Sequence, residues 1–357
     1  MDDINRYIDD ISIGNDKQTF QTIFGHAITG EVYSQKIIIM HNPDGAASKS
    51  TLMNILASVL GDFYKCGERS LAFRNKGSSR NEGGHTEYLT ELEERRLVTF
   101  CESSSSAIVD DYLNEAFFKM SSGEDKITGR GIFEKSKTLR LWFIAFIIVN
   151  KLPNISNDQA VWRRIVVLLM KARFVDNPNP DNIYEKKRDH VFINRLKSEE
   201  NKSALLNWLI EGAFNFYKNG FPNTPDIKEY QIRYQLNNDS VLNFVYDQCI
   251  ISNDRTFCFE ECKDLWERFK IWRKSSSIFC EDKRIIDSLR TFNSLLENKE
   301  LVQISSNDED DDILEHNKTS KNEIVKIVKS KSPLHRRTMF YGIKLKQLNL
   351  ITTSTPL

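Results

Sequence analysis

The sequence predicts an α/β fold with a parallel central sheet over residues 1–225. Strand-like and helical patterns alternate along this segment, as expected when helices pack on a mostly parallel sheet. The unbroken apolar run of residues 141–149 is typical of a strand buried on both faces of such a sheet. An earlier apolar strand, residues 37–40, leads through a loop of small residues into a helix at residues 52–60. These patterns together predict a layered domain that contains a strand–loop–helix unit.

The loop between that strand and helix has the layout of a phosphate-binding loop. Backbone N–H groups at a helix N-terminus form an anion site, while a Lys reaches the outer phosphates and a hydroxyl reaches Mg²⁺. Lys49 and Ser50 would fill these two roles, although Pro43 and Ser48 stand where the usual motif has glycine. The alternative is an ordinary strand–turn–helix. The candidate ATP-binding residues are Asp44, Gly45, Ala46, Ala47, Ser48, Lys49, Ser50 and Thr51.

Three further features follow this loop along the chain. Glu102 ends an apolar strand, where a carboxylate can hold Mg²⁺ or polarise water, although it can also be a solvated strand end. Asn150 ends the next apolar strand at the edge where ligands bind in open α/β sheets, although Asn is also a common turn former. Arg163 and Arg164 precede a further strand and either stabilise phosphate charge or form a surface pair.

A basic segment lies between Glu102 and Asn150. From residue 126 to residue 140, five basic residues face one acidic residue, a local excess that suits the phosphate backbone of DNA. The alternative is a solvated hairpin. The candidate DNA-binding residues are Lys119, Lys126, Arg130, Lys135 and Lys137.

Composition indicates a globular, intracellular protein of about two domains. The 357 residues include 50 Lys and Arg and 50 Asp and Glu, so the chain has no net charge. Any charged surface that binds a partner must therefore be a local patch. The six cysteines form no CxxC pair, which favours reduced thiols over a disulfide framework or a zinc site. The acidic N-terminus is unlike a signal peptide, and the longest apolar run is too short to span a bilayer.

The second predicted domain covers residues 226–357. Residues 220–226 contain two prolines and mark the expected boundary after the first domain, residues 1–225. Helical patterns at 241–249, 260–274 and 282–296 are followed by short strand signals. Three helices before a β-rich end predict a helical, winged-helix-like module.

With these motifs in this order, the chain resembles the superfamily 3 helicases, in particular the helicase domain of poxvirus and phage or plasmid primase–helicases. The resemblance includes residues 25–30 (GHAITG) and 341–345 (YGIKL) and covers roughly residues 15–220 well and 235–347 loosely. It implies an AAA+-like P-loop ATPase core that uses ATP and Mg²⁺. It also implies a hexameric ring that moves along single-stranded or forked DNA during viral or mobile-element replication.

The resemblance implies a role for each matching position. Lys49 and Ser50 would be the Walker A pair, and Glu102 would be the Walker B acid. Ser50 and Glu102 would then hold Mg²⁺. Asn150 would be the sensor that reads the γ-phosphate.

Further expectations concern the partners. Either Arg163 or Arg164 would be the finger that reaches the nucleotide of the neighbouring subunit, and residues 119–130 would belong to a motif with DNA-facing basic side chains. Because the resemblance begins near residue 15, priming would need a separate primase. By analogy with such viruses, replication would take place in the host cytoplasm or nucleus.

Two other functions remain open from the sequence. A pseudo-ATPase would keep the ring and its DNA-binding surface but would have lost turnover through Pro43, Ala47 and Ser48. It would act as a structural or loading subunit. An AAA+-like ATPase that acts on protein partners would hydrolyse ATP without stimulation by DNA.

Overall fold

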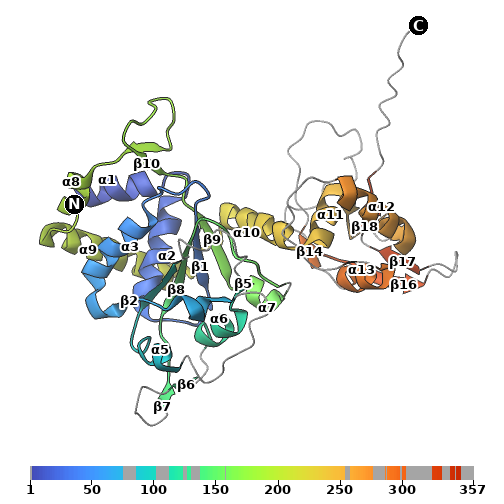
Figure 1. The fold of residues 1–357 in the computed structure, drawn as a ribbon, viewed down its shortest axis with the longest axis horizontal. Coiled ribbons are helices and arrows are strands. Elements are labelled where there is room, and N and C mark those ends of the chain that lie inside the picture. The colour runs from blue at the N-terminus through green and yellow to red at the C-terminus, as the bar shows by residue number, and fades with distance from the viewer. Residues whose placement is uncertain are drawn as a thin grey trace, which may run out of the picture. The chain divides into compact units, whose positions relative to one another are not determined.

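The computed structural model of the chain divides into two compact units, Met1–Tyr234 and Gln235–Leu357 (Figure 1). The division falls within the helix α10 (Pro225–Asn238), because Ile227 and Tyr234 of this helix pack in the core of the first unit. No helix that the structure describes is long and apolar enough to cross a membrane. The described residues are 2–74, 86–101, 112–123, 127–129, 137–156, 158–253, 258–275, 286, 288–297, 300–302, 324–331, 338–341 and 343–346.

The first unit is built around a five-stranded sheet in the order β2-β4-β8-β1-β9 (Figure 1). Every neighbouring pair is parallel, so all strands end at the same edge. The register sets Ile39 in β1 opposite Ile147 in β8 and Val167 in β9. This sheet confirms the predicted α/β class. The strands are β2 (Tyr64–Cys66), β4 (Leu97–Cys101), β8 (Ile144–Val149), β1 (Ile37–His41) and β9 (Ile165–Leu169).

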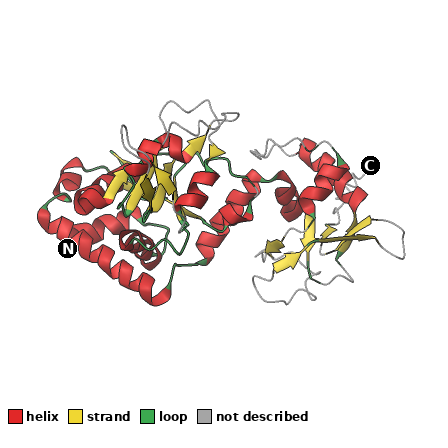
Figure 2. Ribbon diagram, turned by 90° about the horizontal axis from the view of Figure 1, so that it is seen from below, coloured by secondary structure: helices red, strands yellow, loops and turns green. Residues whose placement is uncertain are grey.

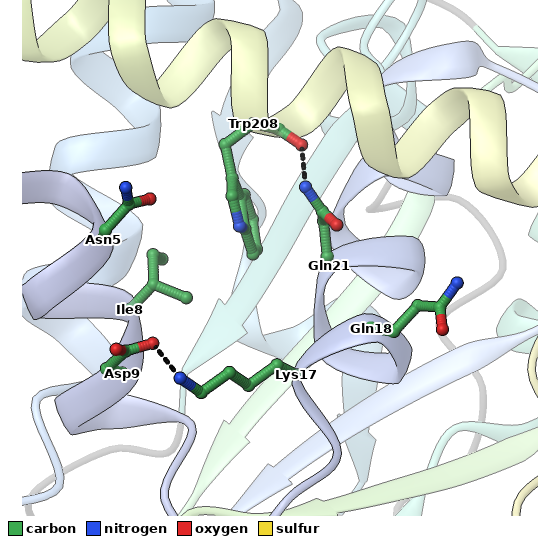
Figure 3. Close-up of a pocket in the computed structure, with 7 residues that line it drawn as sticks. All are labelled: Asn5, Ile8, Asp9, Lys17, Gln18, Gln21 and Trp208. Atoms are coloured by element: carbon green, nitrogen blue, oxygen red, sulfur yellow. Dashed lines mark hydrogen bonds and ion pairs between the residues drawn. The ribbon is translucent and has the colours of Figure 1, made fainter.

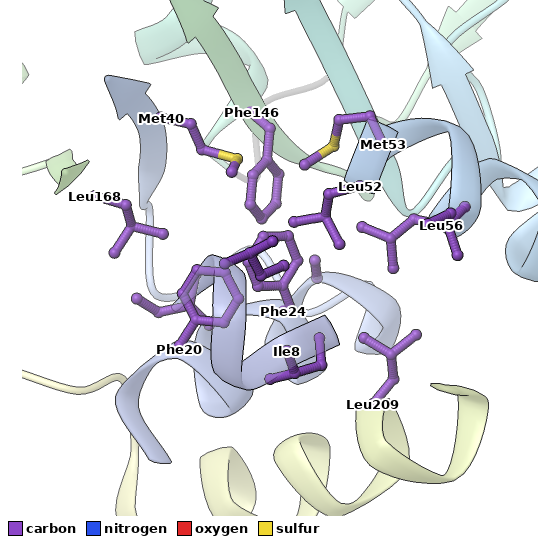
Figure 4. Close-up of a cluster of buried hydrophobic side chains, with 14 of the residues drawn as sticks. Ile8, Phe20, Phe24, Met40, Leu52, Met53, Leu56, Phe146, Leu168 and Leu209 are labelled. Atoms are coloured by element: carbon purple, nitrogen blue, oxygen red, sulfur yellow. The ribbon is translucent and has the colours of Figure 1, made fainter. Parts of the chain in front are cut away.

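Helices cover both faces of this sheet (Figure 2). Successive strand residues point to opposite faces, so Ile38 and Met40 join one buried cluster while Ile37 and Ile39 join the other. This double burial explains why the strands are continuous apolar runs. The first cluster (Figure 4) includes residues of α1 (Asp2–Ile11), α2 (Lys17–Thr29), α3 (Lys49–Leu60) and α9 (Glu199–Asn219). The second includes residues of α4 (Arg69–Ala72), α5 (Thr86–Thr90), α6 (Glu115–Ser121) and α7 (Gln159–Trp162).

The sequence also predicts helices over residues 88–95 and near 109–120, and each is only partly helical among the described residues. The segment 88–95 is helical only to Thr90, and Glu94 has a φ of 64°, which an α-helix does not tolerate. In the described part of the segment 109–120, residues 112–113 form a strand and α6 begins at Glu115, where the Asn114 side chain caps it. The remaining elements of this unit are η1 (Gly61–Phe63), β3 (Phe73–Arg74), β5 (Tyr112–Leu113), β6 (Ile127–Gly129), β7 (Lys137–Leu139), β10 (Arg173–Val175), β11 (Glu185–Lys187) and α8 (His190–Arg195).

A close crossing of α2 and α9 fixes the helices on the first face. A Cβ atom on Gly25 would lie 2.2 Å from the backbone of Ala213, and one on Gly212 would lie 2.1 Å from the carbonyl oxygen of Gln21. Glycine is therefore required at both positions for the two backbones to approach this closely. The Gln21 side chain also donates a hydrogen bond to the Trp208 carbonyl at 3.0 Å.

The second unit combines helices with short antiparallel strands around its own core. The rings of Phe244 and Phe269 lie 5.4 Å apart, those of Phe269 and Phe292 lie 4.9 Å apart, and Trp272 is buried beside them. Helices followed by paired strands are compatible with the winged-helix-like prediction. The elements are α11 (Ser240–Gln248), β12 (Cys249–Ile251), β13 (Phe259–Glu261), α12 (Cys262–Ser275), α13 (Leu289–Leu296), β14 (Glu300–Val302), β15 (Ile324–Lys326), β16 (Val328–Lys331), β17 (Thr338–Tyr341) and β18 (Ile343–Leu345).

His26 is a buried histidine in the core beside the α2–α9 crossing. Its side chain is 0% exposed, its Nε2 atom lies 2.9 Å from the Glu31 carbonyl oxygen, and its ring centroid lies 4.1 Å from that of Phe216. Burial lowers the pKa of His26 to about 4, because the imidazolium would lose its hydration. The ring is therefore neutral in the folded protein at pH values where it is protonated in the unfolded chain.

We expect the free energy of unfolding to fall as the pH drops from about 6.5 to about 4. In this window the unfolded state binds a proton at His26 and the folded state does not. The free energy of unfolding therefore falls by about 3 kcal/mol across the whole window. Urea unfolding at about pH 7 and about pH 5 measures the change. The pH dependence of the free energy of unfolding should be smaller in His26→Gln than in the wild type. It should be unchanged in His190→Gln, which alters an exposed histidine. Equal dependence in wild type and His26→Gln would contradict the assignment.

Candidate functional site

The loop between β1 and α3 contains a concentration of left-handed backbone. Gly45, Ala46 and Ser48 have φ values of 71°, 54° and 58°, and α3 begins directly afterwards at Lys49. A residue with a side chain costs about 1–2 kcal/mol in this conformation, and such strain gathers at functional sites. The structure thus confirms the strand–loop–helix unit and shows that Ser48 adopts a conformation that favours glycine.

Helix α3 starts without a side-chain cap. Ser48 occupies the N-cap position, but its side chain accepts no hydrogen bond from the helix, whereas Asp16 and Ser198 cap α2 and α9. An uncapped first turn presents N–H groups and the positive end of the helix dipole, which attract anions such as phosphate. Of the candidate ATP-binding residues, the exposed ones are Asp44, Ala46 and Ser50, the half-buried ones are Gly45, Ser48 and Thr51, and the buried ones are Ala47 and Lys49.

Lys49 and Asn150 meet at the carboxyl edge of the sheet. The Lys49 Nζ atom donates to Asn150 Oδ1 at 2.6 Å and to the Val149 carbonyl oxygen at 2.9 Å. They meet because β1 and β8 are parallel neighbours in which His41 pairs with Val149. Lys49 is 7% exposed, and a buried ammonium needs such partners. Two residues predicted from separate motifs therefore lie in direct contact beside the loop.

Three residues that no motif predicted also hold the loop. The Asn42 side chain donates to a backbone carbonyl just beyond β9 at 2.5 Å, and the Phe174 N–H donates to the Ala46 carbonyl at 2.9 Å. The Tyr7 hydroxyl lies 3.2 Å from Ser48 Oγ. These partners are far apart in the sequence, and no periodic or motif signal marks them.

The residues predicted to hold Mg²⁺ are only partly placed. Ser50 is exposed in the first turn of α3. Glu102 lies outside the described residues, but Cys101 immediately before it ends β4 opposite Ile148, at the same edge of the sheet. A serine hydroxyl and a carboxylate are hard oxygen ligands of the kind that Mg²⁺ prefers. Within the described part of the chain, no three His, Cys, Asp or Glu side chains gather as a metal site.

The two predicted finger arginines have different surroundings. Arg164 is 7% exposed, donates to Ser122 Oγ at 3.1 Å and also donates to the Ala160 carbonyl. Arg163 is exposed, and Lys36 donates to its carbonyl oxygen at 2.8 Å. Both arginines precede β9 and so lie at the amino edge of the sheet, opposite the loop. The five residues of β1 separate these edges by roughly 16 Å.

The basic segment contains a hairpin, which is compatible both with the DNA-binding interpretation and with its solvated alternative. Strands β6 and β7 pair antiparallel. Of the candidate DNA-binding residues, Lys119 is ion-paired with Asp158, and Lys137 is ion-paired with Glu93 at 2.6 Å. The other three candidates, Lys126, Arg130 and Lys135, lie outside the described residues.

A surface pocket of about 480 Å³ lies among α1, α2 and α9 (Figure 3). None of its lining residues belongs to the loop between β1 and α3. The Lys17 ammonium that could attract an anion is already paired with Asp9 at 2.6 Å. The lining residues are Asn5, Ile8, Asp9, Lys17, Gln18, Gln21 and Trp208.

Comparison with curated proteins identifies viral relatives, although no family model matches the chain. It is 25% identical over 239 residues to "Putative helicase L207/L206" of Acanthamoeba polyphaga mimivirus, covering 65% of this chain and 24% of that protein. It is 26% identical over 159 residues to "Putative primase C962R" of African swine fever virus, covering 44% and 16%. The chain therefore spans a quarter or less of the length of these relatives. The relatives are viral proteins named as helicases and primases, in agreement with a superfamily 3-like helicase.

Among solved structures, "The A form apo structure of NrS-1 C terminal region-CTR" aligns with 92% of this chain and 76% of that chain, at 11% identity and a TM-score of 0.47. A JCV helicase structure aligns with 69% of this chain and 71% of that chain, at 10% identity and a TM-score of 0.28.

Two exposed cysteines, Cys66 and Cys101, end neighbouring strands at the edge that carries the loop. Cys66 pairs with Thr99, and Cys101 lies two residues further along the same face of β4. A hydrogen bond from the Cys101 thiol lowers the pKa of Cys66 to about 6, and the same interaction raises the pKa of Cys101. The Cys66 thiolate is therefore well populated at neutral pH.

We expect iodoacetamide to modify Cys66 faster than the buried Cys262, whose pKa is raised to about 11 by burial. The rate at Cys66 should fall as the pH drops through about 6, because the thiolate is the nucleophile. Peptide mapping by mass spectrometry across a pH series measures both rates. In Cys101→Ala, the pH at which the modification rate of Cys66 is half-maximal should move towards about 8.5. A wild-type midpoint already near 8.5 would contradict the assignment.

Proposed function

We propose that the chain is an ATP-dependent motor of the superfamily 3 helicase class that moves along single-stranded or forked DNA during viral or mobile-element replication. The observation that carries this proposal is the contact of Lys49 with Asn150 beside an uncapped helix N-terminus. A cation, an amide and open backbone N–H groups at the carboxyl edge of the sheet suit a nucleoside triphosphate. The names of the viral relatives support the same class.

In this proposal each residue acts on a different part of the nucleotide. The phosphates would lie against the first turn of α3, and the Lys49 ammonium would exchange its bond with Asn150 for a phosphate oxygen. The released Asn150 amide could then orient the attacking water. Mg²⁺, held by Ser50 and Glu102, would neutralise charge on the phosphates.

The arginine finger would come from a neighbouring subunit. Arg163 lies at the amino edge of the sheet and cannot reach the loop of its own chain, whereas Arg164 is buried and bonded within the subunit. We therefore propose Arg163 as the finger. A contact between the amino edge of one subunit and the loop of the next is head-to-tail, and such contacts form a ring when the rotation between subunits closes. A homo-hexamer is the ring we propose.

The β6–β7 hairpin is the proposed DNA contact. Lys119 and Lys137 are ion-paired, so the contact would depend on opening these pairs or on Lys126, Arg130 and Lys135. We also propose a primase as a partner and an intracellular replication site.

The left-handed Ser48 favours a second function, the pseudo-ATPase. If the serine has impaired the loop, Ser48→Gly should bring a large gain in nucleotide affinity. A change of less than about twofold would show that the serine is tolerated, since twofold is only about 0.4 kcal/mol.

ATP hydrolysis with and without single-stranded DNA tests the proposed function. We expect DNA-stimulated turnover in the wild type and none in Lys49→Ala or Glu102→Gln, because these changes remove the phosphate ligand and the Mg²⁺ ligand. Turnover without any response to DNA would favour action on protein partners. DNA binding without turnover above the Lys49→Ala control would instead support the pseudo-ATPase.

We expect Arg163→Ala to reduce turnover about 10³-fold or more while nucleotide binding is retained. Mixing inactive Arg163→Ala with inactive Lys49→Ala subunits should restore part of the activity, because some interfaces then combine an intact Lys49 with an intact Arg163. Steady-state hydrolysis of the mixtures measures this recovery. Arg233→Ala, which removes an exposed arginine paired with Glu229, should leave turnover unchanged. Failure of every mixture to recover activity would contradict a shared site.

A further inference from the structure

Tyr7 reaches the loop between β1 and α3 from the first helix of the chain. Its side chain is 1% exposed, and its hydroxyl lies 3.2 Å from Ser48 Oγ. The ring belongs to the same buried cluster as Leu52 in α3. A buried phenol needs a hydrogen-bond partner, and Ser48 supplies it.

The contact explains why Ser48 does not behave as an ordinary N-cap. A capping serine turns its oxygen towards the N–H groups of the first helical turn, but Ser48 makes no such bond. Its backbone is also left-handed, with a φ of 58°. A hydrogen bond from outside the loop can offset part of that strain, because it is made only when Ser48 is in this position.

The direction of the hydrogen bond follows from the surroundings of the phenol. Burial raises the pKa of Tyr7, so its hydroxyl keeps its proton. A protonated Tyr7 can donate to Ser48 Oγ, and the Ser48 proton is then available for another acceptor. Phosphate oxygens in the loop would be acceptors within reach of such a donor.

We propose that Tyr7 is a positioning residue of the nucleotide site: it holds Ser48 in its left-handed conformation and orients the Ser48 hydroxyl as a hydrogen-bond donor to a phosphate of the bound nucleotide. This inference rests on the proposed function. It assigns to a Tyr–Ser pair the task that glycine performs in the usual motif, and it adds a phosphate ligand that glycine cannot provide.

Titration with a fluorescent ADP analogue and Mg²⁺ tests the pair. Tyr7→Phe keeps the packed ring and removes the hydroxyl, and we expect it to weaken binding about fivefold, the size of one hydrogen bond. Ser48→Ala should weaken binding to a similar extent, and adding Tyr7→Phe to it should change nothing further. Glycine at position 48 adopts the left-handed conformation without a hydrogen bond from Tyr7. In the Ser48→Gly background, Tyr7→Phe should therefore change the affinity less than about twofold.

Tyr64→Phe is the matched control, because the Tyr64 hydroxyl bonds the Thr99 hydroxyl at 2.8 Å on β4 rather than a residue of the loop. It should leave the affinity unchanged. An unchanged affinity in Tyr7→Phe, or the same loss in the wild-type, Ser48→Ala and Ser48→Gly backgrounds, would overturn the inference while leaving the proposed function intact. Absence of binding by the wild type would overturn both.

Discussion

The parallel pairing of β1 with β8 is the constraint on which the candidate site depends. It sets His41 opposite Val149, so the residues that follow the two strands emerge at one edge. Lys49 can reach Asn150 only in this arrangement. The register is itself fixed by burial, because a slip of one residue would move each apolar side chain of β1 to the opposite face. Packing on both faces of the sheet therefore determines the chemistry at its edge.

The same topology separates the components of the proposed nucleotide site. The loop lies at the carboxyl edge of the sheet, while the exposed Arg163 lies at the amino edge beside Lys36. A motor that needs both must take one of them from a neighbouring chain. The separation within the subunit thus gives a physical reason for the ring that the resemblance implies, and burial distinguishes Arg164 from the exposed Arg163.

Local patterns predicted the parts of the fold that local sequence determines. The apolar run of β1, the small-residue loop and the start of α3 could all be found by pattern, and Asn150 could be placed at the end of β8. The contacts of Tyr7 and Phe174 with the loop could not, because they join segments far apart in the sequence and have no periodicity. The late start of α6 depends on the Asn114 cap, a local signal hidden within a helical pattern.

A crystal structure with Mg²⁺ and a non-hydrolysable ATP analogue tests the central claim most directly. We predict that the phosphates lie against the first turn of α3, that Lys49 Nζ leaves Asn150 Oδ1 for a phosphate oxygen, and that Arg163 of the adjacent subunit approaches the γ-phosphate. An analogue bound elsewhere, for example in the pocket beside Trp208, with the Lys49–Asn150 contact unchanged, would contradict the account.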